Sequence, residues 1–384
     1  MILNGFWAIP FTLLLKVISP IYPIVIQKLY SERIGHFIHD SALELMYSQT
    51  TKSLTTKWFY MGKISNSYWG TKIKGSDLNI LGGWLKWVDN WNRIIFPKIA
   101  SSANNSINFS KDIHGIFANS NYRISFTETE NSIGRNWLRS KGWIEGQEIV
   151  CILVRDSKYL QNYSPLSQKI DWSYHSYRNS EIKAYKLGIE WLLSRGIFVI
   201  RMGKDMESPL TISDSNFSDY AFDRTRSDFL DIWLFLNCDY LISTGAGLDV
   251  LGYINHKPQL YLNYLPFPEI VTWSNAVSAP KKLYWSESCT RLTLEEQVHC
   301  SFTKTKDYLD AGIRIDDLSE NEILYEIMYF WKIVKGKKGI SGKDAAKNDK
   351  AWSLLCSSPN SEKFHNWRHP NFSLGREILD SIEA

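Results

Sequence analysis

Apolar and polar residues alternate in blocks along the second half of the chain, and the blocks predict strands that alternate with helices. Continuous apolar runs at 147–154, 197–202, 239–243 and 259–264 are typical of strands buried on both faces. Segments 179–196, 227–238 and 320–334 place apolar residues on one helix face. This alternation predicts a parallel sheet with right-handed crossovers. We therefore expect a Rossmann-like domain that begins near residue 146.

The first half shows the same kind of pattern less sharply. We interpret 31–39 as a strand with its loop, 40–49 as a helix capped by Asp40, and 57–64 as the next strand. Segment 82–96 reads as a tryptophan-rich helix, and 127–142 as a helix with a capped start. These elements predict a second α/β domain in front of the first.

The first thirty residues are strongly apolar. Lys16 lies at the centre of segment 2–29, and Pro10, Pro20 and Pro23 interrupt it, so a spanning helix is disfavoured. A signal peptide is disfavoured too, because no basic region precedes the run and no small-residue cleavage site follows it. We expect short amphipathic pieces at a bilayer surface. The alternative is a segment that packs into the core or binds a partner.

Length and composition narrow the class of protein. A chain of 384 residues exceeds the usual size of one core, so two domains are expected. We divide it into 1–30, 31–145, 146–335, and a linker with a tail at 336–384. A net charge of +4 is too small for a dedicated nucleic-acid binder. The five cysteines lack metal-ligand spacing, which favours a reduced, intracellular compartment.

Polar residues follow four of the predicted strands and loops in the second half. In an open α/β sheet, ligands bind beyond the carboxyl ends of the strands. The candidates are Arg155 and Asp156 in the first loop, His175, Arg178 and Asn179 before a helix, Arg201, Gly203 and Lys204 after the next strand, and Ser243, Thr244, Gly245, Ala246 and Gly247. Together they suggest a phosphorylated, nucleotide-like ligand. Taken singly, each is equally well an ion pair, a helix cap, a basic surface loop or a tight turn.

A candidate general base lies in the first half. His36 follows the first predicted strand, and a histidine there can accept a proton near neutral pH. Asp40 and Asp156 are substitutes for this role, and a packed or capping histidine is the alternative. The chain has no D-x-D and no H-E-x-x-H motif, so we expect neither a metal nor another cofactor.

Several motifs in the same order resemble a family of bacterial glycosyltransferases. They are R-I-G-H (33–36), V-R-D-S-x-Y-L (154–160), H-S-Y-R-N-S-E-I (175–182), V-I-R-M-G (199–203), the 227–247 segment, P-K-K-L-Y (280–284), L-T-L-E-E (292–296), E-N-E-I (320–323) and H-P-N-F-S-L (369–374). Where the family has T-S-S-G-L, this chain has 244–248 as T-G-A-G-L, so phosphate contacts there would come from the backbone.

The resemblance implies two facing Rossmann-like domains, the GT-B architecture, and transfer of a sugar from a nucleotide-sugar donor. The donor would lie in the C-terminal domain, a glycan or lipid-linked acceptor in the N-terminal one, and the tail would return to the first domain. We expect a role in surface polysaccharide assembly, peripheral to the cytoplasmic face of the membrane. Two alternatives remain: an enzyme on this scaffold that transfers a non-sugar group, and a non-catalytic carbohydrate-binding or scaffold protein.

Overall fold

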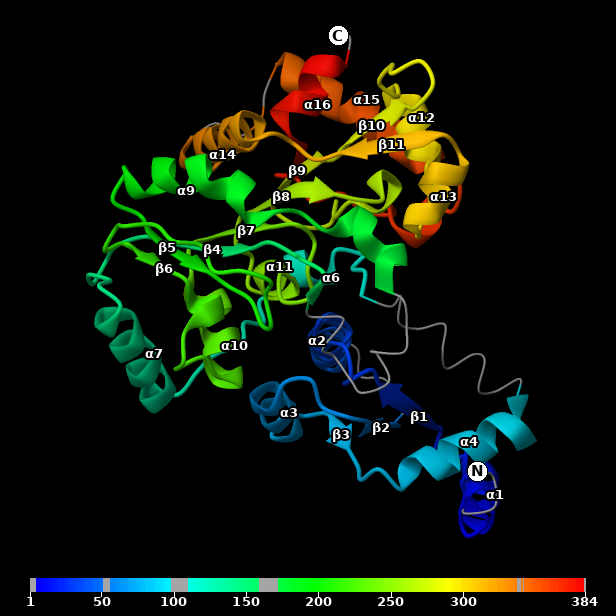
Figure 1. Cartoon of the computed structure of the whole chain (residues 1–384). Helices are drawn as coiled ribbons and strands as arrows, with labels where there is room; N and C mark the ends of the chain where they lie inside the picture. The colour runs from blue at the N-terminus through cyan, green and yellow to red at the C-terminus, as the bar shows by residue number, and fades with distance from the viewer. Residues whose placement is uncertain are drawn as a thin grey trace. The chain divides into compact units, whose positions relative to one another are not determined.

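The chain folds as two compact units, which are described separately here (Figure 1). The computed structural model describes residues 5–50, 56–97, 110–158, 172–336, 340 and 342–382. Unit 1 comprises Met1–Asp112 with Asn119–Tyr122, and unit 2 comprises Ile113–Ala118 with Arg123–Ala384. This division differs from the predicted boundary at 145/146 mainly by one helix, which belongs to unit 2.

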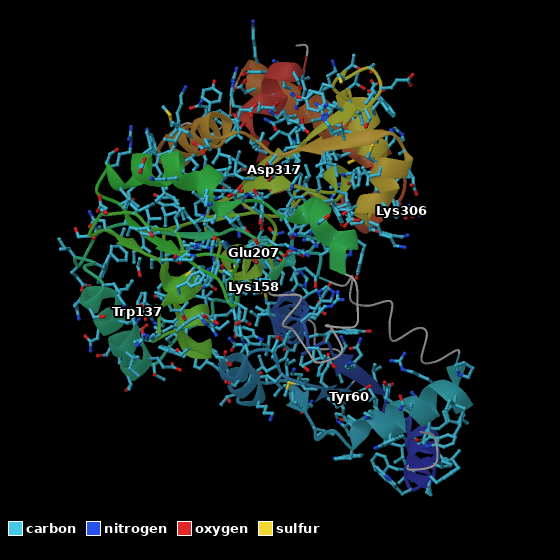
Figure 2. The ribbon with its side chains drawn as sticks, in the orientation of Figure 1. Tyr60, Trp137, Lys158, Glu207, Lys306 and Asp317 are labelled. Carbon is cyan, nitrogen blue, oxygen red and sulfur yellow. The ribbon has the colours of Figure 1, made fainter. Side chains whose placement is uncertain are left out.

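Unit 1 is built on a small parallel sheet in the order β1-β2-β3. Its strands are β1 (Ile24–Leu29), β2 (Thr56–Met61) and β3 (Asn79–Ile80), and its helices are α1 (Ala8–Ile18), α2 (Ile34–Thr50), α3 (Ser67–Lys74) and α4 (Leu85–Ile95). Helix α3 starts at Asn66, whose side chain accepts a hydrogen bond from Trp69 N. Buried Tyr60, labelled in Figure 2, donates a 2.9 Å hydrogen bond to Asp89 and so ties β2 to α4.

The structure confirms part of the prediction for this unit and corrects part of it. The strand at 57–64 and the helix at 82–96 are confirmed as β2 and α4. The strand predicted at 31–39 is wrong, because helix α2 already begins at Ile34 and buries Phe37 and Ile38 together with the following turns. The first strand lies earlier, at Ile24–Leu29, inside the segment that we assigned to a membrane surface.

Unit 2 carries a seven-stranded sheet in the order β12-β9-β8-β7-β4-β5-β6. All its neighbouring strands are parallel, which confirms the predicted α/β class. The strands are β4 (Ile149–Leu153), β5 (Phe198–Arg201), β6 (Phe217–Ser218), β7 (Tyr240–Ser243), β8 (Gln259–Tyr264), β9 (Ala276–Pro280) and β12 (Ser373–Leu374). A separate antiparallel pair consists of β10 (Lys282–Trp285) and β11 (Ile313–Asp316).

Helices cover both faces of the large sheet. The helices described are α6 (Ile116–Asn119), α7 (Glu128–Ser140), α9 (Lys186–Leu193), α10 (Asp228–Asn237), α11 (Val250–Ile254), α12 (Leu294–His299), α13 (Thr305–Asp310), α14 (Glu320–Lys335), α15 (Lys343–Ser357) and α16 (Arg376–Ser381). Short 3₁₀ helices occupy Trp172–Arg178 (η4), Ile182–Tyr185 (η5), Tyr220–Phe222, Phe267–Glu269 and Ser361–Lys363. Apolar residues of α9 and α14 pack with Val150, Val199 and Leu260 on one face, and α7, α10 and α11 lie on the other in Figure 1.

Local signals set several of these helix boundaries. Thr127 and Ser319 each form a reciprocal capping box at the start of α7 and α14. Ser227 caps α10 as predicted, since its side chain accepts a hydrogen bond from Leu230 N. Helix α7 packs closely on α10 through Gly134, and Trp137, labelled in Figure 2, donates a 2.8 Å hydrogen bond to Thr225. These contacts explain why α7 belongs to unit 2.

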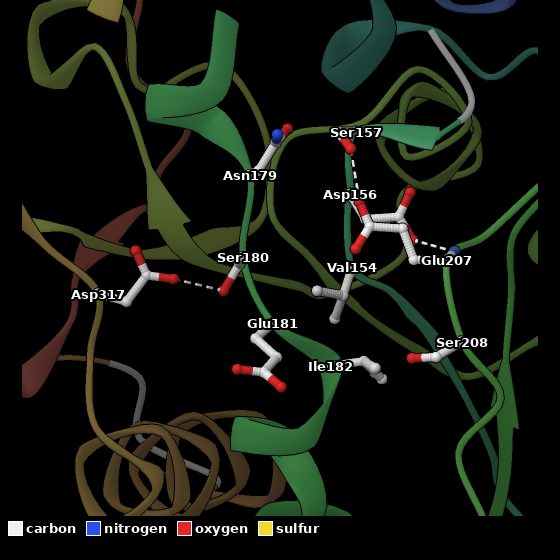
Figure 3. Close-up of a pocket in the computed structure, with 10 residues that line it drawn as sticks. All are labelled: Val154, Asp156, Ser157, Asn179, Ser180, Glu181, Ile182, Glu207, Ser208 and Asp317. Atoms are coloured by element: carbon white, nitrogen blue, oxygen red, sulfur yellow. Dashed lines mark hydrogen bonds between the residues drawn. The ribbon is translucent and has the colours of Figure 1, made fainter. Parts of the chain in front are cut away.

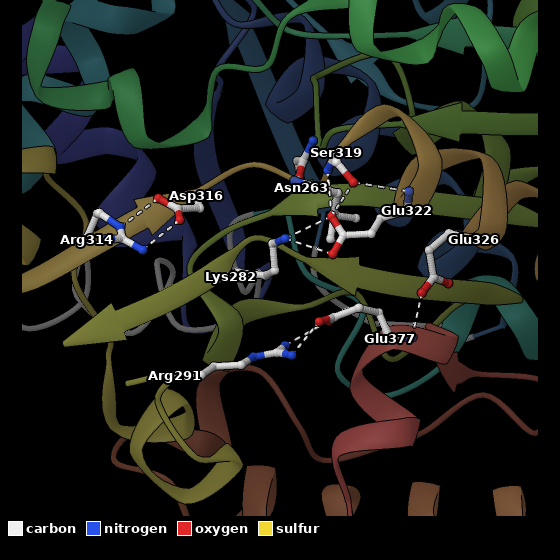
Figure 4. A network of polar contacts seen from close by, with 10 residues as sticks. Asn263, Lys282, Arg291, Arg314, Asp316, Ser319, Glu322, Glu326 and Glu377 are labelled. Carbon is white, nitrogen blue, oxygen red and sulfur yellow. Dashed lines mark hydrogen bonds and ion pairs between the residues drawn. The ribbon is translucent and has the colours of Figure 1, made fainter. Parts of the chain in front are cut away.

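The last fifty residues are more regular than predicted. The linker expected at 336–350 is largely replaced by helix α15, and the tail forms β12 and α16. Strand β12 pairs with β9 at the edge of the large sheet. Figure 4 shows how ion pairs and hydrogen bonds hold this region: Arg291 binds Glu377, and the buried Glu326 carboxylate accepts hydrogen bonds from Arg376 N and Glu377 N. These contacts of the tail lie within unit 2.

Candidate functional site

The order of strands defines a switch point in the large sheet. Strand β4 is an interior strand; the chain runs outward from it through β5 and β6, then returns to β7 on the other side of β4. In open parallel sheets of this kind, a crevice forms beyond the carboxyl ends of the two strands at that reversal. Here those ends lead into Arg155 and into the turn at Ser243–Gly247.

Hydrogen bonds join the two strand ends. Thr244 N donates to Leu153 O at 3.2 Å, and Arg155 N donates to the Thr244 hydroxyl at 2.9 Å. Arg155 O in turn accepts from Ser180 N at 2.9 Å. The structure thus brings together three of the four segments that the sequence analysis selected.

Arg178 completes this group. Its Nη2 donates a 2.7 Å hydrogen bond to Gly245 O. Its Nε is buried and has no hydrogen-bond partner within the described part of the chain. Burial raises the pKa of the neighbouring Tyr177, and the positive charges of Arg178 and Arg155 oppose that rise. The charges of both guanidinium groups therefore act on Tyr177, and such groups form charge-assisted hydrogen bonds with anions.

The Ser243–Gly247 turn is held by its own hydrogen bonds. Ser243 Oγ donates to buried Asp249 at 2.9 Å and accepts from Gly245 N at 3.2 Å and Ala246 N at 3.4 Å. Burial raises the pKa of Asp249 to about 7. Gly245 has a φ of +79°, and a methyl group there would lie 2.5 Å from the Tyr264 ring. Two of the backbone N–H groups that we expected to bind phosphate are thus already bonded to Ser243.

A second set of contacts fixes the segment that carries Arg178. Buried Lys281 donates to Asn179 O and to Asp317 Oδ1, both at 2.5 Å. Asn263 Nδ2 donates to Ser180 Oγ at 2.9 Å, and Ser180 donates to Asp317 Oδ2 at 2.9 Å. Burial lowers the pKa of Lys281 despite the adjacent Asp317. Sequence analysis assigned no role to Lys281, Asn263 or Asp317, although Lys281 lies within the P-K-K-L-Y motif.

A cavity of about 370 Å³ opens beside β4 (Figure 3). It is lined by carboxylates, hydroxyl groups, an amide and two aliphatic side chains: Val154, Asp156, Ser157, Asn179, Ser180, Glu181, Ile182, Glu207, Ser208 and Asp317. Asp156 accepts hydrogen bonds from Lys158 N at 3.1 Å and Glu207 N at 2.8 Å, and Ser157 donates to Glu207 at 2.5 Å. Burial raises the pKa of Asp156. Such a lining offers acceptors to hydroxyl groups and disfavours phosphate.

Arg201 occupies a different setting from Arg178. Its side chain is only 1% exposed and donates from Nη1 to Asp219 at 3.0 Å and to Ser208 O at 2.8 Å. Gly203 has a φ of +155° and adjoins Met206, and half-buried Lys204 follows it in the loop after β5. No contact described for these three residues joins them to Arg155 or Arg178. Their donor-binding role stays a prediction.

His175 lies in η4, three residues before Arg178. Its ring centroid is 3.9 Å from that of Tyr174 and 6.2 Å from that of Tyr177. Tyr177 in turn contacts Tyr308, with ring centroids 5.6 Å apart. These tilted ring contacts position η4, so His175 has a packing role in the structure. Its donor-binding role stays a prediction.

The predicted bases of the first half belong to unit 1. His36 Nδ1 and Ser110 Oγ are 2.7 Å apart, and Ser110 N donates to Asp40 Oδ1 at 3.1 Å. Buried His39 Nδ1 lies 3.2 Å from the same carboxylate oxygen. Burial lowers the pKa of His36, and the charge of Asp40 opposes this. The lowered pKa keeps the His36 imidazole neutral near pH 7, as a proton acceptor must be.

Comparison with known proteins adds little. No protein-family model matches the chain, and no curated protein matches it. A solved structure described as "The crystal structure of the glycosyl transferase family 9 from Veillonella parvula DSM 2008" is similar to it, with a TM-score of 0.46 and 9% sequence identity, over 80% of this chain and 96% of that one.

In the described ranges, no group of three or more His, Cys, Asp or Glu side chains is placed to hold a metal ion.

Proposed function

We propose that this chain is a glycosyltransferase, which transfers a sugar from a nucleotide-sugar donor to a glycan or lipid-linked acceptor. One observation carries the proposal. Arg155, Arg178 and the Ser243–Gly247 turn gather at the switch point of a parallel sheet, beside a polar cavity. A nucleotide-sugar carries both an anionic diphosphate and a hydroxyl-rich sugar, and the two halves of this site match those two chemistries.

The arginine side of the site would bind the diphosphate. Arg178 has a buried Nε without a partner in the described residues, and its Nη2 already holds the Gly245 carbonyl in place. A half-buried guanidinium that is fixed at one nitrogen is suited to a charge-assisted contact with phosphate oxygen. In the sugar transfer, these positive charges stabilise the negative charge that develops on the leaving diphosphate.

The cavity would bind the sugar. Asp156 and Glu207 provide carboxylate oxygens, and Ser157, Ser180 and Ser208 provide hydroxyl groups that can donate or accept. Carboxylates bind sugar hydroxyls well and repel phosphate. The sugar of the donor would therefore lie in the cavity, and its diphosphate would lie at the arginines. The order of the site along the chain, with Arg155 next to Asp156, fits a ligand that spans both parts.

For the chemical step, we assign proton removal to His36, with Asp40 or Asp156 as substitutes. The base takes the proton of the acceptor hydroxyl as its oxygen forms a bond to the anomeric carbon. The bond from that carbon to the diphosphate oxygen breaks, and its electron pair leaves with the nucleoside diphosphate. The proposal places the acceptor in the N-terminal domain of a GT-B arrangement, in surface polysaccharide assembly at the cytoplasmic face of the membrane.

The first test is donor binding by the Arg178→Ala variant. Loss of a charge-assisted contact should weaken the binding of nucleoside diphosphates and nucleotide-sugars roughly tenfold or more, measured by titration calorimetry. Arg314→Ala is the matched control, since Arg314 is an exposed arginine of the same unit whose ion pair is with Asp316 and whose other contacts are Cys289 and the Tyr284 ring. We expect this control to bind donor as the unchanged chain does.

Three results would count against the proposal. Equal donor affinity in the two variants would remove the diphosphate site. Absence of saturable binding by every nucleotide-sugar tested would favour transfer of a non-sugar group. Donor binding without release of nucleoside diphosphate in the presence of lipid-linked acceptor would favour a non-catalytic carbohydrate-binding protein.

A further inference from the structure

Helix α1 exposes an unusually apolar face. The side chains that point to solvent from α1, from the residues just before it and from the turn after it are Phe6, Trp7, Leu13, Leu14, Val17, Ile18, Ile21 and Tyr22. Val17 is 75% exposed and Ile21 is 89% exposed. Single exposed apolar residues are common, but a contiguous set of this size marks a surface that contacts something else. We call this set the α1 face.

The side of α1 that faces the core of unit 1 is the side opposite the α1 face, and it is packed against α4. Ala8 is fully buried against Leu85 and Val88 of α4. Thr12 Oγ1 donates to Ala8 O at 2.8 Å and reaches Val88 O at 3.5 Å. Helix α1 thus buries its inner side against α4.

Two tryptophans of α4 hold the start of α1. Trp91 Nε1 donates to Gly5 O at 2.8 Å. Gly5 also lies so close to Trp87 that a methyl group there would be 2.6 Å from the ring. These contacts fix α1 in one orientation, with its outer side still apolar, so the α1 face is a built feature of unit 1.

The charges around the α1 face have one sign. The charged residue of α1 is Lys16, and those of α4 are Lys86, Asp89 and Arg93. Asp89 is buried, where it accepts hydrogen bonds from Tyr60 and Arg93. Lys16 lies 5.4 Å from the Phe96 ring centroid, and Lys86 is exposed. The chain has no carboxylate before Glu32, so the accessible charge on these two helices is positive.

We propose that the α1 face docks unit 1 onto an anionic lipid bilayer. Apolar side chains with two aromatic residues at the helix start, flanked by lysines, are the pattern that binds at the headgroup boundary. Helix α1 has 11 residues and is about 16 Å long, half of the ~30 Å hydrocarbon thickness. It would lie along the surface. No helix in the parts of the chain described here is long and apolar enough to cross a membrane.

The test uses the full chain and phosphatidylcholine vesicles with and without phosphatidylglycerol, in a sedimentation assay. The unchanged chain should bind the anionic vesicles. The double variant Val17→Asp, Ile21→Asp should bind them at least tenfold more weakly, because it places charge on the inserting side. Both positions are highly exposed, so the fold should tolerate the change.

The control is the double variant Ile144→Asp, Leu309→Asp. These residues of unit 2 are 71% and 67% exposed, close to the exposure of Val17 and Ile21. It should bind vesicles as the unchanged chain does. Lys16→Gln and Lys86→Gln should each weaken binding to anionic vesicles by about fivefold and leave the weak binding to neutral vesicles unchanged.

Failure of the unchanged chain to bind either vesicle, or equal binding by both double variants, would overturn the proposal. A concentration-dependent dimer that only Val17→Asp, Ile21→Asp abolishes, seen by sedimentation velocity, would show instead that a second copy covers the face. Binding of soluble nucleotide-sugars does not require the α1 face. The docking and the glycosyl transfer can therefore fail separately.

Discussion

Arg178 and Arg201 are similar in sequence context, since each accompanies a predicted strand end or helix start, but their surroundings differ in the structure. Arg201 is buried and its charge is balanced by Asp219. Arg178 is half-buried and donates to the carbonyl of Gly245. Buried nitrogens without a partner in the described ranges occur on both arginines, at Nε of Arg178 and at Nε and Nη2 of Arg201, so the difference between them is the ion pair. The half-buried Arg178 guanidinium forms no ion pair within the described residues, so its charge can be met by an anionic ligand. This contrast, which sequence cannot show, makes Arg178 the better candidate for binding an anion.

Buried Glu326 predicts a pH dependence of stability. Burial raises its pKa from 4.5 to about 7, with Glu377 and Asp380 adding to the rise. The folded state then binds the proton more tightly than the unfolded state, so this group stabilises the fold below pH 4.5 and loses that contribution as the pH rises to 7. The loss is on the order of 3 kcal/mol. Denaturant unfolding between pH 4.5 and 8 would measure it.

Glu326→Gln isolates this effect. The variant keeps an oxygen that can accept from Arg376 N or Glu377 N, but it cannot ionise. Its free energy of unfolding should fall less than that of the unchanged chain over the same pH range. Asp249, whose pKa is also raised to about 7, contributes in the same direction, so Asp249→Asn is the comparison. Parallel pH profiles for the unchanged chain and Glu326→Gln would contradict the assignment.

At the scale of elements, the close contact of α7 with α10 makes an unusual prediction for Gly134→Ala. Replacing glycine by alanine inside a helix ordinarily stabilises by about 0.5–1 kcal/mol. Here the added methyl group would lie 2.2 Å from Trp233, whose indole is held by a 3.1 Å hydrogen bond to Asn131. We expect a net loss of about 1–3 kcal/mol in unfolding free energy.

The control for this prediction lies on the outer side of the same helix. Ser132 is exposed, so Ser132→Ala should change stability by less than about 0.5 kcal/mol. Thermal or denaturant unfolding of both variants measures the two changes in unfolding free energy. A more stable Gly134→Ala variant would mean that α7 can move away from α10 without cost.

The elements show which parts of this fold a sequence can reveal. Strands buried on both faces, such as β4 and β7, have continuous apolar runs, and Ser227 marks the start of α10 by an ordinary cap. Strand β12 has only two residues and owes its place to pairing with the distant β9. Such a strand has no local pattern of its own, so the tail was wrongly predicted to be irregular.

The error in unit 1 has a different cause. Residues 24–29 belong to a strand, but only Ser19 and a short stretch with two prolines separate them from the apolar run of α1. Because the run was interpreted as one segment, the first strand was placed too late, at 31–39. In the candidate site, the loops after β4 and β7 were found from the strand ends alone. Lys281, Asp317 and Asn263 were missed, because only the fold brings them to Ser180 and Asn179.

At the scale of the whole molecule, the two units contain different parts of the proposed activity. Unit 2 contains the switch point, the two arginines and the cavity, whereas unit 1 contains His36 and the α1 face. If the proposed function is correct, donor recognition belongs to one unit, and proton removal and membrane contact belong to the other. Donor recognition can then be lost while proton removal and membrane contact remain, and the reverse also holds.

This division predicts the behaviour of a fragment, Ile113–Ala384, which corresponds to unit 2 with four residues of unit 1. The seven-stranded sheet and its covering helices lie within it, so we expect it to fold cooperatively by circular dichroism and thermal unfolding. It should bind nucleoside diphosphate within a few-fold of the full chain, because the described contacts of Arg178 and Gly245 lie inside it. It should transfer no sugar and should not bind vesicles.

The full-length His36→Ala variant is the matched control. It should bind donor and vesicles normally but lose most transfer, and this loss should not recover at higher donor concentration. A folded fragment that no longer binds donor would show that unit 1 also contributes to the donor site, and an unimpaired His36→Ala variant would move the search for the base to Asp40 and Asp156.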